Sequence, residues 1–297
     1  MAVMLRGVYP ILVTPFDDHE EPDEESLRHL VDFTIAAGVH GLGIALGSEI
    51  QQLSEREREH VIRIVVDQTR GRVPVVVNSG TPASRTAALA SRQAVDLGAA
   101  AVMCLPPTPA SASETRAYFK AISEAVDVPV FIQDTQTTPV PAAQIRRIAE
   151  ESEHVRYAKV ESPPQPTHVQ AAVDASQGLV TIFGGAGGGY FPEELRRGSQ
   201  GTMPWPSQAE TFVRIWDLWQ AGDEHAAVEL HERQIVPLAR LSTAGIRLGH
   251  AVHKEILRRR GVIRSARVRS PADPLDPVTL RELDLLCDRL GLGTPVG

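Results

Sequence analysis

The stretch AAVMCLPPTPASASETRAYFKAISEAVDVPVFIQ, residues 100–133, contains two apolar runs separated by a helical pattern. The runs at 100–105 and 128–133 have the length and composition of buried strands. Between them, Ser113 precedes the amphipathic segment ETRAYFKAISEAV, and a serine in this position is a signal for the start of a helix. A strand, a helix and a second strand in this order are typical of the α/β class.

The same alternation continues on both sides of this stretch. Strand-like runs occupy residues 8–13, 41–46, 73–77, 100–105, 128–133, 155–160, 179–183 and 201–203. Helical patterns follow start signals such as Asp23 and Ser54, and several of them end at a glycine, as at Gly38, Gly71 and Gly98. Eight successive units of this kind predict a (β/α)8 TIM barrel.

The pattern becomes entirely helical from about residue 208 to the end of the sequence. We therefore expect two parts: a barrel formed by residues 1–206, and a C-terminal helical extension, residues 207–297, packed on the barrel. No low-complexity segment separates the two.

Composition limits the classes of function. The chain of 297 residues is 42% hydrophobic, which is enough for a large core, and its net charge of -7 gives no electrostatic reason to expect nucleic acid or an anionic membrane. Cys104 and Cys287 match no metal-ligand spacing, and the histidines show no metal-binding pair, so we expect no metal and no cofactor. The N-terminus has no apolar leader and no run is long enough to cross a membrane, so we expect a cytoplasmic protein.

One lysine stands out in the sixth strand, HVRYAKVES, residues 154–162. The chain has only three lysines, Lys120, Lys159 and Lys254. Lys159 lies near the carboxyl end of its strand, where barrels carry their reactive groups. Burial disfavours the charged ammonium, and the neutral amine can attack a ketone to form a Schiff base. The alternative is a strand-end lysine that reaches solvent or a carboxylate.

Two further polar residues belong to neighbouring strand ends. Strand alternation places Glu161 on the same side as Lys159, so it is a candidate for proton transfer, although a salt bridge with an arginine is an equal alternative. Gln133 is expected to bind a substrate hydroxyl or carboxylate, or only to support the adjacent strand. Asp134 has the opposite parity and is expected to face away from the barrel lumen.

Two loops are candidates for substrate binding. Gly47 and Ser48 follow the second strand and are expected to bind a substrate carboxylate through backbone N–H groups and the hydroxyl; the alternative is an ordinary turn. Glu49 is expected to be a structural hydrogen-bond acceptor. The glycine-rich segment FGGAGGGY, residues 183–190, follows the seventh strand, where barrels place anion-binding loops. A lone glycine-rich loop is weak evidence for a nucleotide site. We therefore predict that Gly185 allows close approach of a substrate.

Five segments occur in an order and spacing that resemble a known superfamily. They are GVYPILVTPF from Gly7, GSE at residues 47–49 followed by LSEREREHV, YAKVE at 157–161, RRGSQGTMP at 196–204 and VHKEILRRRGVIRS at 252–265. Together they resemble the dihydrodipicolinate synthase and N-acetylneuraminate lyase superfamily over nearly the whole chain. The resemblance implies a class I enzyme that acts on a 2-keto acid, with Lys159 as the imine-forming lysine. It also implies a homo-oligomer, a tetramer or a dimer.

The chain departs from the superfamily pattern at three places. The usual Gly-Thr-Thr-Gly-Glu loop is replaced by ALGSE, residues 45–49. Gln133 stands where a tyrosine usually ends strand five, and Thr108 lies in the region where a second tyrosine is expected. A Thr-Tyr-Tyr proton relay therefore cannot operate, and an amide is neither acid nor base at neutral pH. These differences disfavour both the lysine-biosynthetic synthase and the sialic acid lyase activities.

The combination of Ser48-Glu49, Gln133-Asp134 and KVES is similar to the 2-keto-3-deoxy-L-arabonate dehydratase branch. This resemblance implies that an imine at C2 acidifies the C3 hydrogens and that the C4 hydroxyl leaves as water. A retro-aldolase that releases pyruvate from a related 2-keto acid would use the same imine and is the first alternative. A catalytically silent barrel that binds a 2-keto acid is the second, suggested by the loss of the tyrosine relay.

Overall fold

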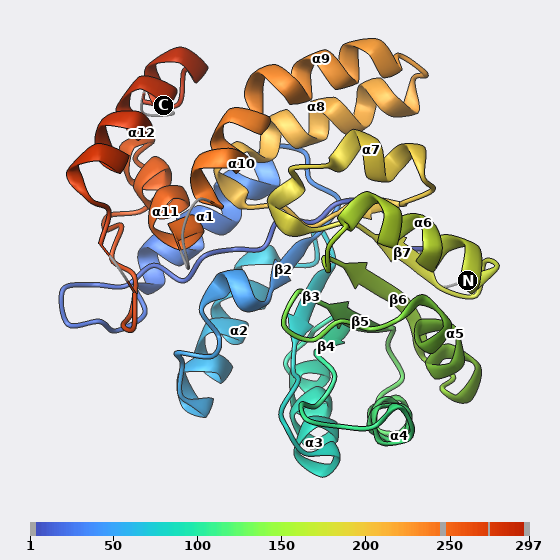
Figure 1. The fold of residues 1–297 in the computed structure, drawn as a ribbon. Coiled ribbons are helices and arrows are strands. Elements are labelled where there is room, and N and C mark those ends of the chain that lie inside the picture. The colour runs from blue at the N-terminus through green and yellow to red at the C-terminus, as the bar shows by residue number, and fades with distance from the viewer. Residues whose placement is uncertain (1–3, 244–247, 273, 294–297) are drawn as a thin grey trace. The chain divides into compact units, whose positions relative to one another are not determined.

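The strands of the protein run in the order that the sequence predicts. A computed structural model describes residues 4–243, 248–272 and 274–293 (Figure 1). The strands are β1 (Gly7–Val8), β2 (Leu42–Ile44), β3 (Val75–Asn78), β4 (Ala101–Cys104), β5 (Val130–Asp134), β6 (Val155–Val160), β7 (Thr181–Phe183) and β8 (Gly201–Thr202). Each lies within or beside one of the eight predicted runs, so the α/β class is confirmed.

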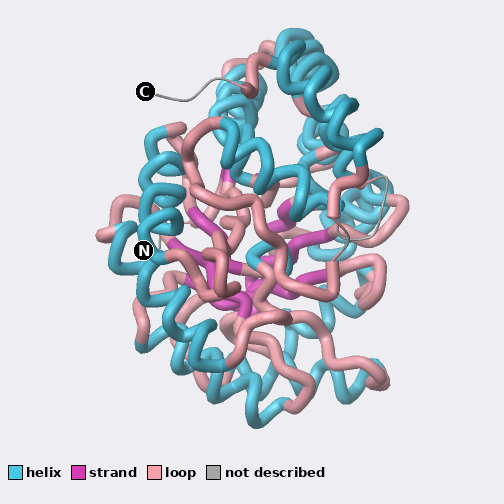
Figure 2. The backbone as a smooth tube through the Cα atoms, turned by 90° about the vertical axis from the view of Figure 1, so that its left-hand side faces the viewer, coloured by secondary structure: helices cyan, strands magenta, loops and turns pink. Residues whose placement is uncertain are grey.

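The strands pair in parallel and in sequence order. β2 to β7 form one six-stranded sheet, and β1 pairs with β8 in a second. A parallel bridge between Gly184 and Thr202 links the end of β7 to β8. The amide of His40, which precedes β2, donates to the carbonyl of Val8 in β1 at 3.0 Å. Figure 2 distinguishes the strands, in magenta, from the helices, in cyan.

β1 is shorter than the predicted run at residues 8–13. The Tyr9 amide still donates to the carbonyl of Thr202, at 2.9 Å. The Ile11 amide continues this series by donating to the carbonyl of Pro204 at 2.8 Å. Pro10, between them, has no N–H group and cannot donate to a neighbouring strand. The predicted run therefore makes strand-like hydrogen bonds beyond the two residues of β1.

A helix follows each of the eight strands. These helices are α1 (Glu24–Ala36), α2 (Glu55–Thr69), α3 (Ser84–Asp96), α4 (Ala112–Ser123), α5 (Ala142–Glu151), α6 (Gln165–Ser176), α7 (Phe191–Arg196) and α8 (Ala209–Gln220). Asp23 and Ser54 are the N-caps of α1 and α2, as predicted. The predicted start at Ser113 is wrong: Ser111 caps α4 through a reciprocal capping box with Glu114, and Ser113 lies inside the helix.

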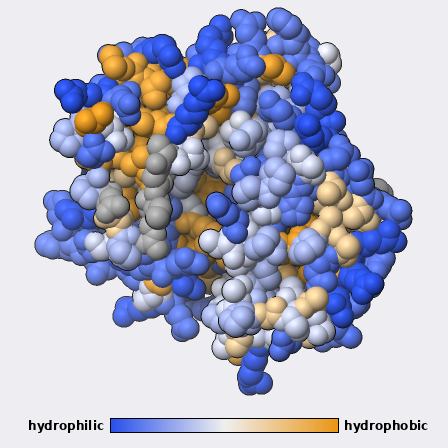
Figure 3. Space-filling model, viewed as in Figure 1, coloured by the Kyte–Doolittle hydropathy of each residue, from blue (hydrophilic) through white to orange (hydrophobic). Residues whose placement is uncertain are grey.

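The C-terminal region is helical, as predicted. Its helices are α9 (Glu224–Gln234), α10 (Val236–Ser242), α11 (Leu248–Arg259) and α12 (Pro277–Leu290). The last three share one apolar core, formed by Leu238, Leu241, Val252, Ile256, Leu283, Cys287, Leu290 and Leu292. Val278 and Leu285, both on α12, are exposed large hydrophobic residues. Figure 3 shows hydrophobic atoms at the upper left of the view.

The internal contacts divide the chain into two compact units. The first contains the residues up to Tyr9, His40–Gly43 and Pro74–Met203, and the second contains Pro10–Val39, Ile44–Val73 and the chain from Pro204 onward. These units interleave in sequence, and the expected boundary between residues 206 and 207 stays a prediction. Within the described ranges, no helix is both long enough and apolar enough to cross a membrane.

Candidate active site

An aromatic layer lies below the polar ends of β5 and β6. The ring of Phe131 stacks on that of Tyr157 at 4.6 Å and meets that of Phe183 edge-on at 5.6 Å. Two residues further along, Gln133 and Lys159 are paired in register. Because strand residues two apart share a face, these polar side chains lie directly above the aromatic layer. The layer shields one side of the lysine from water.

Lys159 is buried and ion-paired. Its side chain is 6% exposed, and its Nζ lies 2.9 Å from Oε2 of Glu161. The other carboxylate oxygen of Glu161 accepts a hydrogen bond from the Ala186 amide at 2.7 Å. The carboxylate that the sequence placed on the same side as Lys159 is therefore in direct contact with it, and the loop after β7 holds that carboxylate in place.

Gln133 supplies a buried side-chain amide donor next to Lys159. Its side chain is fully buried, and its Oε1 accepts from Nδ2 of Asn78 at 2.6 Å. Its Nε2 has no hydrogen-bond partner among the described residues. Buried polar groups are nearly always satisfied, so an unpaired amide donor next to Lys159 marks a position where a ligand oxygen can bind. Asn78, at the end of β3, was not predicted.

Asp134 holds the chain segment that carries Glu161. Its two carboxylate oxygens accept from the amides of Val140 at 2.7 Å, Glu161 at 3.0 Å and Ser162 at 2.8 Å. Ser162 in turn hydrogen-bonds through its hydroxyl to Nδ1 of His168. A carboxylate with three backbone donors is a rigid anchor, so Asp134 positions Glu161 through the main chain. From the sequence, strand alternation predicted only that the Asp134 side chain points to the opposite side of the strand from Gln133.

Gly185 is a glycine because Glu161 packs against it. Its backbone is extended, with φ of -158°, so conformation alone does not require a glycine. A Cβ at this position would lie 2.5 Å from Oε1 of Glu161, which is too close for any side chain. The next residues, Ala186–Gly188, form a short 3-10 helix whose first amide binds the same carboxylate. Gly185 thus keeps the loop close to Glu161, and its contact with a substrate stays a prediction.

Gly47 and Ser48 belong to the second unit and form a tight 3-10 turn, Leu46–Ser48. The Ser48 hydroxyl donates to the carbonyl of Leu12 and accepts from the Ala45 amide at 3.1 Å. Thr14 donates to the Ser48 carbonyl at 2.7 Å. The hydroxyl therefore already has main-chain partners, and the predicted role of this turn in carboxylate binding stays a prediction.

Glu49 closes the same turn. It has a left-handed backbone conformation with φ of 56°. One carboxylate oxygen accepts from the Arg269 amide at 3.0 Å, and the carboxylate forms a buried ion pair with Lys254. The second buried lysine of the chain is thus tied to a structural carboxylate.

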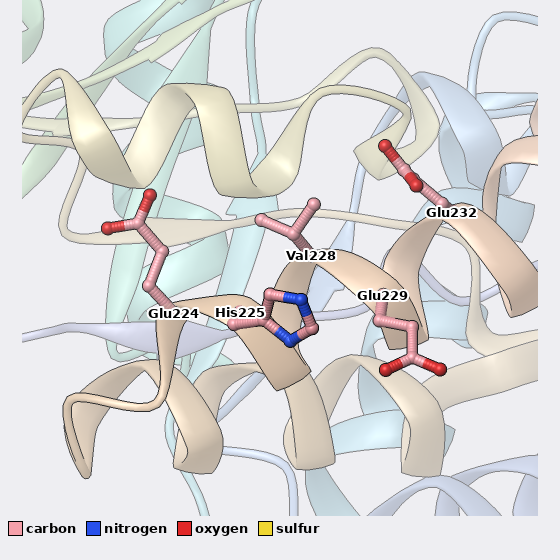
Figure 4. Close-up of a pocket in the computed structure, with 5 residues that line it drawn as sticks. All are labelled: Glu224, His225, Val228, Glu229 and Glu232. Atoms are coloured by element: carbon pink, nitrogen blue, oxygen red, sulfur yellow. The ribbon is translucent and has the colours of Figure 1, made fainter.

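A surface pocket on α9 is separate from the residues around Lys159. It is lined by Glu224, His225, Val228, Glu229 and Glu232, all from one helix. In Figure 4 the carboxylates of Glu224 and Glu232 lie far apart and that of Glu229 points away from both. Among the described residues, no group of three or more potential ligands could hold a metal ion.

Comparisons with known proteins give matches over most of the chain. The model of the "Dihydrodipicolinate synthetase family" matches residues 4–287. An L-2-keto-3-deoxyarabonate dehydratase of Azospirillum brasilense is 30% identical over 301 residues, which cover 96% of this chain and 94% of that protein. A 4-hydroxy-tetrahydrodipicolinate synthase of Methanopyrus kandleri is 31% identical over 250 residues, 81% of this chain and 82% of that protein. The crystal structure of dihydrodipicolinate synthase from Rhodopseudomonas palustris has a TM-score of 0.88 at 28% identity and covers 96% of this chain and 97% of its own.

Proposed function

Because the chain belongs to the dihydrodipicolinate synthetase family, we propose that it is a Schiff-base lyase for a 2-keto-3-deoxy sugar acid, of the 2-keto-3-deoxy-L-arabonate dehydratase type. The family and the named relatives support the lyase class. The observation that carries the proposal is the buried Lys159, whose Nζ lies 2.9 Å from the Glu161 carboxylate. We place this pair at the mouth of a (β/α)8 barrel.

The pair has the chemistry that a dehydration needs. The Lys159 amine attacks the C2 ketone, and loss of water forms an iminium that acidifies the C3 hydrogens. Glu161 is the carboxylate in contact with the amine, so it is the proposed acceptor of the C3 proton. The enamine then expels the C4 hydroxyl, which takes that proton from Glu161 and leaves as water. Hydrolysis of the remaining imine frees the product and regenerates Lys159.

Dehydration is favoured over retro-aldol cleavage by two observations. Gln133 replaces the tyrosine of the usual relay, and its free Nε2 is placed to bind a substrate oxygen. The relative from Azospirillum brasilense is named as a dehydratase and aligns with nearly the whole chain. The proposed enzyme needs no cofactor. Its assembly as a tetramer or dimer and its cytoplasmic location stay predictions.

The imine is tested by trapping. Incubation with pyruvate and borohydride, followed by peptide mass spectrometry, is expected to give a reduced adduct on Lys159. Lys120 is the internal control, because it is an exposed lysine on α4. No adduct, or an adduct only on Lys120 or Lys254, would show that the protein is a silent 2-keto-acid-binding barrel or uses another site.

The reaction type is tested with a panel of 2-keto-3-deoxy pentonates and hexonates. Each compound is assayed for the dehydrated 2-keto acid and for pyruvate. A dehydratase is expected to release the dehydrated product without pyruvate, whereas pyruvate as the main product would assign the retro-aldolase alternative.

Substitution of Gln133 by alanine tests substrate positioning. We expect a higher KM or a modest loss of kcat, about tenfold to a hundredfold in kcat/KM, because one buried hydrogen bond to the substrate is removed. Asn78→Ala is the matched control: it leaves the Gln133 Nε2 in place and removes the donor to its Oε1, together with the acceptor of the Gly80 amide. Equal damage in both variants would indicate that Gln133 only supports the neighbouring strand.

A further inference from the structure

A second carboxyl group lies behind the Lys159–Glu161 pair. Glu194 belongs to α7, is fully buried, and neither of its carboxyl oxygens has a hydrogen-bond partner among the described residues. It packs against the loop after β7 so closely that a Cβ on Gly184 would lie 1.6 Å from its Oε2. A Cβ on Gly185 would likewise be too close to Glu161. The adjacent glycines Gly184 and Gly185 thus leave space for the side chains of two glutamates.

The two carboxyl groups have different surroundings. One oxygen of Glu161 lies 2.9 Å from Nζ of Lys159, and the other accepts from the Ala186 amide at 2.7 Å. Among the described residues, neither oxygen of Glu194 has an ion-pair or hydrogen-bond partner at such a distance, although the Gly185 amide and Lys159 are near enough to act on it. Burial, followed by repulsion from Glu161 and Glu193, raises the pKa of Glu194 to about 8, although the Gly185 amide and Lys159 act in the opposite direction.

Among the described residues, α7 and its neighbour α6 carry other charged groups. Arg196, at the end of α7, is exposed. The guanidinium of Arg197 donates to the carbonyl of Glu193 at 2.9 Å. On α6, which packs against α7, His168 binds Ser162, and Asp174 accepts from Gln170 at 3.0 Å. Lys159 acts on both carboxyl groups, since it pairs with Glu161 and lowers the pKa of Glu194.

We propose that Glu194 is a positioning residue of the proposed lyase site, a buried neutral acid that leaves Glu161 as the single negative charge beside Lys159. This inference rests on the proposed function. Two carboxyl groups in one site with different surroundings commonly divide into an ionised and a protonated member. The substrate is itself an anion, so a second negative charge would oppose its binding and would hold the Lys159 ammonium more strongly.

The expected consequence is a loss of pyruvate binding at alkaline pH. Above pH 8, Glu194 ionises and adds a second negative charge next to Glu161. Glu194→Gln has nearly the same shape and remains neutral, so it is expected to keep its affinity at high pH. The two proteins should agree within about twofold at pH 6.5, and the wild type should need about tenfold more pyruvate than the variant at pH 9.5.

The measurement is the pyruvate concentration that gives half-maximal borohydride trapping on Lys159, determined from pH 6.5 to 9.5. Glu153→Gln is the matched control, because it removes an exposed carboxylate just before β6 and is expected to follow the wild type. If Glu194→Gln fails to fold, Glu194→Met supplies a second neutral side chain of similar length.

The possible outcomes test the role of Glu194 separately from the proposed lyase function. An adduct on wild-type Lys159 with parallel pH profiles in the wild type and the neutral variant overturns the role of Glu194 and leaves the lyase proposal standing. Absence of any wild-type adduct overturns both. A loss of trapping at pH 6.5 in the neutral variant would also contradict the inference, because a neutral acid and a neutral amide should be equivalent there.

Discussion

Turnover is expected to fall by several orders of magnitude when Lys159 is replaced by arginine. The guanidinium keeps the positive charge and can still pair with Glu161, but it remains protonated at any working pH and cannot form an imine. The larger head group must fit into a buried site above Phe131 and Tyr157, so a destabilisation of about 1–3 kcal/mol is also expected. Steady-state turnover and the midpoint of urea unfolding measure the two effects separately.

The conservative exchange at an exposed lysine provides the control. Lys120→Arg, on α4, should retain both turnover and stability, because its side chain is 57% exposed and its pair with Glu124 spans 4.0 Å. Turnover retained in Lys159→Arg, together with greater damage in Gln133→Ala, would reverse the roles proposed for these two residues.

Substitution of Lys254 by methionine is expected to have the largest effect on stability. Its side chain is fully buried, pairs with Glu49, donates to the carbonyl of Arg267 at 2.8 Å and lies 4.4 Å above the Phe16 ring. Removal of the amine leaves the buried Glu49 carboxylate without this cation. Breaking a buried pair on one side typically costs about 3–5 kcal/mol, which is a large fraction of the stability of a domain. Urea unfolding followed by circular dichroism measures the loss.

A double substitution tests the reason for that loss. Lys254→Met combined with Glu49→Gln removes both charges, so it is expected to be less destabilised than Lys254→Met alone. Lys120→Met is the surface control and should change the free energy of unfolding by no more than about 0.5 kcal/mol. If Lys254→Met lowers the free energy of unfolding by less than about 1 kcal/mol, the ion pair between Lys254 and Glu49 contributes little to stability.

The local pattern of the chain was sufficient to predict its elements and its family. The eight strands, the caps at Asp23 and Ser54 and the position of Lys159 depend on residues close together in sequence. Motifs spread along the chain predicted the superfamily, and the family match over residues 4–287 confirms it. The misplaced start of α4 has a local cause too, because both Ser111 and Ser113 are acceptable caps and only the bond with Glu114 selects the first.

The partners of the site residues depended on the tertiary structure. Strand parity placed Lys159 and Glu161 on one side but could not show whether they touch. The bond between Asn78 and Gln133 joins residues that are 55 positions apart.

Glu194 gave no sequence signal, because an acidic residue in the first turn of a helix is ordinarily exposed. Its burial follows from the packing of α7 against the loop after β7. Hydrophobic period and capping are properties of neighbouring residues, whereas the surroundings of a buried charge are set by segments that meet only when the chain has folded.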